Sequence, residues 1–144
     1  MKEEIVKLVT RGDFYLKEAK SKFWIKPEEE QGSASCNCSK SIKKYLKAYD
    51  FFLTEGENLV DNLHDLLSVI VEKDPEFQQF YDKVYEVKCF AKASKTKGEE
   101  FYMLDDEVDK TIKIALGIRD YITNKIHFEK KFLSEYLGAS FMAI

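Results

Sequence analysis

The chain has 144 residues, of which 44% are hydrophobic and 34% are charged, and its formal net charge at pH 7 is -3. A chain of this length buries about two-thirds of its unfolded surface around one core, so we expect a single domain over residues 1–144. Because a strongly basic surface is the usual footprint of nucleic-acid binding, the acidic balance excludes a global attraction to nucleic acid and leaves only local sites.

The amino terminus and the cysteines indicate the compartment. The stretch MKEEIVKLVT has acidic residues directly after the first lysine and lacks the apolar region of a signal peptide, and no apolar run approaches the length of a membrane span. The three cysteines, Cys36, Cys38 and Cys89, are an odd number, and two of them lie too close together for the disulfide framework of a secreted protein. We therefore expect a cytoplasmic protein with reduced thiols and no membrane partner.

Apolar residues at helical spacing predict two helices in the first half of the chain. The first covers residues 2–26, and Gly12 inside it is a weakness worth about 1 kcal/mol. Pro27 ends this helix, and the polar residues that follow predict a flexible loop near 27–34. The second helix starts at residue 35 and is capped near Gly56, with its apolar side chains inside an arc of roughly 120°.

Two shorter segments follow. Residues 59–71 carry an apolar face that predicts a third helix. A fourth helix is expected to start at Asp74 and Pro75, because an aspartate can cap free backbone N–H groups and proline is preset for the first helical position. The periodicity breaks near residues 94–102, which predict a second flexible loop.

The last core helix should begin near Asp105 or Asp106, whose charges suit a helix amino terminus, and continue through Ile126. Apolar residues recur less regularly after His127 and predict a C-terminal helical extension. No alternating strand pattern and no glycine-rich phosphate loop occurs in the sequence. We therefore predict an all-α fold: an antiparallel up-and-down bundle of four to five core helices plus the C-terminal extension.

Two stretches within residues 38–77 resemble the HEPN family of small helical bundles. The first, CSKSIKKYLKAYDFFLTEG, is similar to the family's second helix with its EKxLKA core, although Lys43 stands where the family usually has glutamate. The second, at residues 64–67 and 74–77, resembles the family's HDL helix and the start of the next helix. The matching positions of the first stretch are Lys44, Leu46, Lys47 and Ala48.

The resemblance implies a dimerising bundle. Members of the family include nucleotide-binding modules, RNA-cleaving toxins of toxin–antitoxin pairs, and proteins that pair with small nucleotidyltransferases. It therefore implies a homodimer that binds a nucleotide, an RNA or a nucleotidyltransferase-like protein partner, and it leaves these functions open because a fold does not settle a function.

Catalytically active branches of the family carry an arginine and a histidine separated by four to six residues near the last core helix. Here Arg119 and His127 are separated by seven residues. Along one helix this spacing advances about 12 Å and turns the side chains roughly 80° apart, so neither orients the other. We therefore expect a non-catalytic module. The alternative is a metal-independent ribonuclease, in which a helix break after Asn124 brings His127 back as the proton carrier beside Arg119.

Two residues of the helical segments are candidates for ligand binding. Arg119 lies on an apolar helix face, where it extends past the core to solvent, pairs with a carboxylate, or binds a phosphate or stabilises a transition state. His64 lies at the edge of another apolar face, where it either hydrogen-bonds a neighbouring helix or contacts a ligand.

The lysines of the second helix lie opposite its apolar stripe, so they form either a solvated surface or a local contact for phosphates. Among them we select Lys44 and Lys47 as candidate ligand-binding residues. Cys36 and Cys38 lack the two further ligands of a structural zinc site, so we predict neither a metal nor a cofactor. A third hypothesis makes the apolar C-terminal segment the interface of a purely structural interaction domain.

Overall fold

A computed structural model describes residues 2–25, 28–57, 60–97 and 105–126 of the chain. Within these residues the fold is all-α, as predicted, and no strand occurs among them. The elements are α1 (Lys2–Ile25), α2 (Glu28–Leu53), α3 (Leu63–Lys73), the 3₁₀ helix η1 (Pro75–Phe80), α4 (Tyr81–Lys97) and α5 (Asp105–Lys125).

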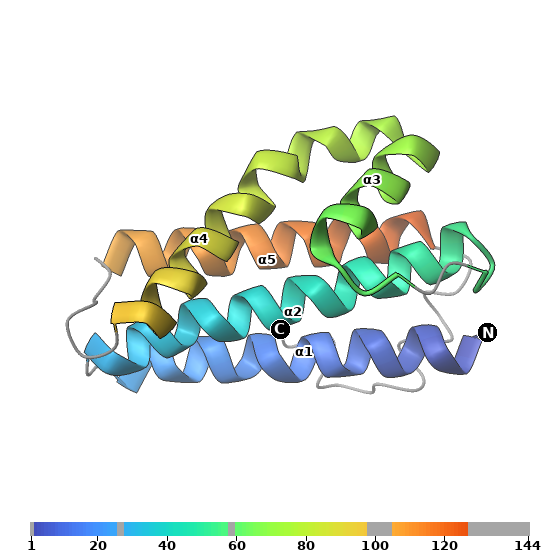
Figure 1. Cartoon of the computed structure of the whole chain (residues 1–144). Helices are drawn as coiled ribbons and strands as arrows, with labels where there is room; N and C mark the ends of the chain where they lie inside the picture. Colours follow the sequence, from blue (N-terminus) through green and yellow to red (C-terminus); the bar gives the residue numbers. More distant parts are fainter. Residues whose placement is uncertain (1, 26–27, 58–59, 98–104, 127–144) are drawn as a thin grey trace.

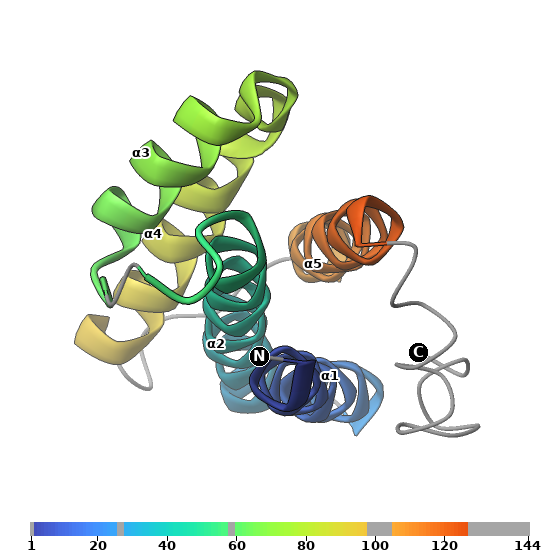
Figure 2. The same cartoon turned by 90° about the vertical axis from the view of Figure 1, so that its right-hand side faces the viewer.

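The helix α2 is the centre of the bundle. It packs against α1, α3, α4 and α5, and Figure 2 shows α1 and α5 on one side of it and the α3–α4 pair on the other. The long helices α1, α2, α4 and α5 alternate in direction along the chain (Figure 1), which supports the predicted up-and-down arrangement. In contrast to α1 and α5, α4 lies obliquely across α2.

The predicted loop near 27–34 is wrong, because α2 begins at Glu28 and residues 28–34 are helical. Gly32 and Ser33 weaken a helix locally, but packing of α2 along α1 buries Ala34 and Ser35 and overrides this propensity.

The other boundaries differ by smaller amounts. Residues 94–97 belong to α4 rather than to a loop. The helix predicted at 59–71 begins only at Leu63, because the Asn62 side chain caps it by accepting from the N–H groups of His64 at 2.9 Å and Asp65 at 3.3 Å. The predicted extension after His127 lies outside the described residues.

The contact between α1 and α2 is closest at Gly12. A Cβ atom at this position would lie 2.5 Å from Cε1 and 2.8 Å from Cδ1 of the Tyr45 ring, which is fully buried. The Ser41 hydroxyl donates to the Gly12 carbonyl at 2.8 Å and holds the two backbones together. The glycine predicted as a weakness of the first helix is therefore the residue that allows this close approach.

A second junction joins η1 to α2 and α5 near the carboxyl ends of these two helices. The Asp74 Oδ2 atom accepts hydrogen bonds from the Tyr49 hydroxyl at 2.6 Å and from the Tyr121 hydroxyl at 2.7 Å. Phe77 packs against both of these tyrosine rings. The predicted start of the fourth helix at Asp74 is wrong, because the 3₁₀ helix η1 follows it and α4 begins only at Tyr81. The Asp74 side chain makes no capping hydrogen bond and accepts from the two tyrosines instead.

We expect Gly12→Ala to lower the free energy of unfolding by about 1–3 kcal/mol, because overpacking against Tyr45 outweighs the gain in helix propensity of about 1 kcal/mol. The measurement is urea denaturation followed by circular dichroism. Gly117→Ala in α5 is the matched control, since its Cβ would meet Phe80 Cε1 at an ordinary 3.8 Å. Equal stability of the two variants would contradict the close contact at Gly12.

Candidate functional site

Arg119 is buried between α5 and α1. Its Nε atom donates to Asp13 Oδ1 at 2.9 Å, and both side chains are only 8% exposed. The Tyr45 hydroxyl of α2 donates to the same carboxylate oxygen. Among the roles predicted for Arg119, the structure shows the pairing with a carboxylate. His127, its proposed catalytic partner, lies outside the described residues.

Asp13 is the buried carboxylate at which α1, α2 and α5 meet. Burial raises the pKa of Asp13, and the hydrogen bonds from Tyr45 and Arg119 act in the opposite direction. Burial also raises the pKa of the Tyr45 hydroxyl, which keeps it protonated as a donor. Because an isolated charge is costly in the core, Asp13 and Arg119 each depend on the other for a compensating partner.

The candidate His64 lies on the exposed first turn of α3. Its Nδ1 atom is 3.3 Å from the Tyr85 hydroxyl of α4, and the Tyr85 ring lies against Tyr81 with their centroids 5.1 Å apart. The contact corresponds to the predicted hydrogen bond to a neighbouring helix. It also places His64 beside Asn62 and Leu63, which line a pocket.

The two lysine candidates have different surroundings on α2. Lys47 forms an ion pair with Asp61, whose Oδ2 atom also lies 3.6 Å from Lys43 Nζ. Burial lowers the pKa of Lys44, and the positive charges of Lys47 and Arg11 lower it further. The structure thus brings Lys44 and Lys47 together on one surface, while Arg119 lies in the core.

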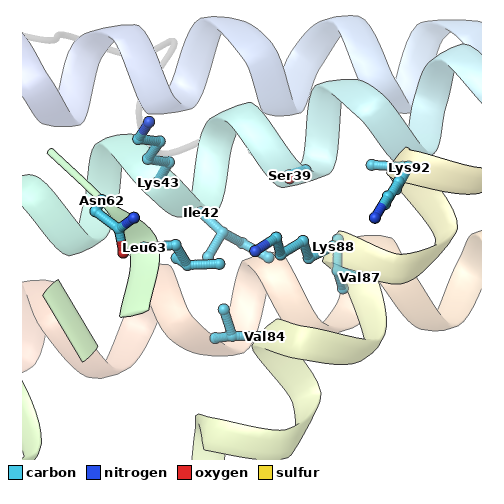
Figure 3. A pocket seen from close by; sticks show the side chains of 10 residues that line it. Ser39, Ile42, Lys43, Asn62, Leu63, Val84, Val87, Lys88 and Lys92 are labelled. Atoms are coloured by element: carbon cyan, nitrogen blue, oxygen red, sulfur yellow. The ribbon is translucent and has the colours of Figure 1, made fainter. Parts of the chain in front are cut away.

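A pocket of about 400 Å³ lies between α2, α3 and α4 (Figure 3). Half of the residues that line it are aliphatic, two are neutral and polar, and three are lysines from two helices. No acidic side chain is among the described residues that line it. The aliphatic residues are Ile42, Leu63, Val84, Val87 and Ala91, the neutral polar residues are Ser39 and Asn62, and the lysines are Lys43, Lys88 and Lys92.

The residues selected from the sequence do not line this pocket. His64 follows the lining residue Leu63 in the chain, and Lys47 pairs with Asp61, which precedes the lining residue Asn62. Lys88 and Lys92 were missed. Their four-residue spacing places them on one side of α4, next to its buried residues Val84, Val87 and Ala91. Lysines with this spacing also occur along the solvated edge of an ordinary helix. The sequence therefore could not distinguish lysines that line a pocket from lysines that face solvent.

A second pocket of about 450 Å³ lies between α4 and α5, over Phe80, Ile114 and Gly117. Two of its lysines are neutralised locally, since Lys110 pairs with Glu86 at 2.7 Å and Lys113 with Asp109 at 2.8 Å. Asp109 itself lines the pocket. This lining therefore includes an acidic side chain, unlike the described lining of the pocket between α2, α3 and α4.

Among the described residues, no group of three or more histidine, cysteine, aspartate or glutamate side chains is placed to hold a metal ion. None of the described helices combines the length and the apolar character that crossing a membrane requires. Comparisons of the chain with protein-family models, with curated proteins and with solved structures found no match.

We expect Arg119→Met and Asp13→Asn each to reduce the free energy of unfolding by about 3–5 kcal/mol, because either change leaves a buried group without its partner. The double variant Asp13→Asn, Arg119→Met should lose less than the sum of the two, since both charges are then absent. Urea denaturation of the four proteins measures the coupling. Additive losses would show that the two side chains act independently.

Proposed function

We propose that the chain is a non-catalytic, HEPN-like binding module whose pocket between α2, α3 and α4 takes an anionic small molecule of the nucleotide class. The observation that carries this proposal is the combination of an aliphatic floor with Lys43, Lys88 and Lys92 around it, without an acidic lining residue among those described. Lysines bind phosphate as mobile point charges, and aliphatic walls remove water from the uncharged part of a ligand.

The dimensions and the polar groups of the pocket support this proposal. A volume of about 400 Å³ lies within the range of small-molecule sites. Ser39 and Asn62 supply neutral polar groups that fix the orientation of a ligand. Asn62 and Leu63 also mark the first turn of α3, whose dipole adds positive potential at the same end of the pocket.

The contacts of the polar residues favour binding over the ribonuclease alternative. Arg119 donates to Asp13 in the core, and the ribonuclease would need this arginine at a reacting phosphate. His64 contacts Tyr85 and is not within the described junction around Arg119. The homodimer and the RNA or nucleotidyltransferase-like partner implied by the HEPN resemblance remain expectations of this proposal.

We expect ATP to bind the purified chain in isothermal titration without added metal, and Lys88→Met to weaken the binding about tenfold or more. A hydrogen bond to a charged group contributes about 1.5–3 kcal/mol, which corresponds to this loss. Arg119→Met, when folded, should keep the affinity of the original chain, because the arginine lies outside the pocket.

Lys83→Met is the control, since Lys83 lies on the same helix and loses the same charge but lines the other pocket. A similar loss in Lys83→Met and Lys88→Met would indicate general charge attraction and contradict the proposed pocket. The proposal also fails if neither ATP nor any of AMP, ADP and GTP binds.

A further inference from the structure

The carboxylate of Asp61 occupies a position between two lysines at the edge of the pocket. It pairs with Lys47 and lies 3.6 Å from Lys43, although its own side chain is 68% exposed. The hydrogen bond from Lys47 and the positive charges of Lys43 and Lys47 lower the pKa of Asp61. Lys43 and Lys47 are four residues apart on α2, so both point to the same side of the helix.

Further positive charge lies next to this pair. Lys44 of α2 and Arg11 of α1 lie close enough for their charges to interact, and neither forms an ion pair among the described residues. We call Arg11, Lys43, Lys44 and Lys47 the cationic cluster. The charges of Lys43, Lys44 and Lys47 therefore act on the carboxylate of Asp61, and with Arg11 beside Lys44 this surface of α1 and α2 keeps an excess of positive charge.

The cationic cluster is continuous with the pocket. Lys43 belongs to both, because it lines the pocket and also approaches Asp61. Asn62, the neighbour of Asp61 in the chain, lines the pocket at the same end, and Figure 3 shows it on the same side as Lys43. A ligand held in the pocket can therefore extend its charged end past Lys43 towards Lys47.

We infer that Lys43 and Lys47, flanked by Lys44 and Arg11, form a subsite for the outer phosphates of an oligophosphate ligand, and that Asp61 is the chain's own occupant of this subsite, which the ligand displaces. The inference rests on the proposed function for the placement of the other end of the ligand. A phosphate group brings more negative charge and more acceptor oxygens than a carboxylate. Because Asp61 is exposed, its displacement leaves the core packing unchanged.

The displacement makes the site selective for the number of phosphates. A ligand with one phosphate held at Lys88 and Lys92 leaves Asp61 in place and does not reach Lys47. A ligand with a second or third phosphate replaces the carboxylate and contacts Lys43 and Lys47. Only a ligand whose outer phosphates bind Lys43 and Lys47 more strongly than the Asp61 carboxylate does can therefore occupy the subsite.

The test uses inorganic pyrophosphate as the probe, titrated calorimetrically into the full chain at low ionic strength. We expect Asp61→Asn to bind pyrophosphate about 3- to 10-fold more tightly, since the competing charge is removed. Lys47→Met should weaken binding about tenfold. Glu72→Gln, which removes an exposed acid elsewhere on α3, is the charge-matched control and should stay within about twofold of the original chain.

The inference is overturned if Asp61→Asn binds pyrophosphate no more tightly than Glu72→Gln, or if no variant binds it. Thermal melts of each variant confirm that it is folded before titration. The two proposals fail separately. If ATP binding depends on Lys88 while pyrophosphate binding ignores Asp61 and Lys47, only the subsite is wrong. If pyrophosphate binding responds to Asp61→Asn while Lys88→Met leaves ATP binding unchanged, only the pocket is wrong.

Discussion

The Asp13 carboxylate holds three helices together, because Arg119 of α5 and Tyr45 of α2 both donate to the same oxygen of this α1 residue. The hydroxyl of Tyr45 reaches Asp13 only because the ring lies directly against Gly12, where no side chain intervenes. A buried ion pair adds little net stability over an apolar core, but it penalises any arrangement that separates the two charges. The relative position of α1, α2 and α5 is therefore specified by this junction.

This frame leaves one side of α2 for α3 and α4, which build the pocket. Ser39, Ile42 and Lys43 are spaced three and four residues apart on α2, so they meet α4 on one face. The same helix presents Lys44 and Lys47 towards α1 and Asp61, on the other side of Lys43. One rigid helix therefore carries the buried junction, the pocket and the cationic cluster, while the contacts of Arg119 remain separate from those that a ligand would make.

The sequence predicted the elements better than their contacts. Apolar periodicity identified every long helix, and the position of Arg119 on an apolar face made a carboxylate partner one of the predicted alternatives. The sequence did not identify Asp13 as this partner, because Asp13 is 106 residues away in the chain and helical spacing carries no information about which helices meet. The helical residues 28–34 were missed because packing against α1 outweighs local propensity. Lys88 and Lys92 were missed because lysines beside an apolar stripe have the same spacing whether they face solvent or a pocket.

The location of the ligand is tested most directly by titrating ATP into ¹⁵N-labelled protein and following the backbone amide resonances. The proposed site predicts that the largest shifts occur at Ser39, Lys43, Asn62, Val87 and Lys88, whereas Asp13 and Arg119 change little. Largest shifts around Asp13 and Arg119 would place the ligand at the buried junction and make the arginine a binding residue. An unchanged spectrum at saturating ATP would contradict the assignment of a nucleotide-class ligand.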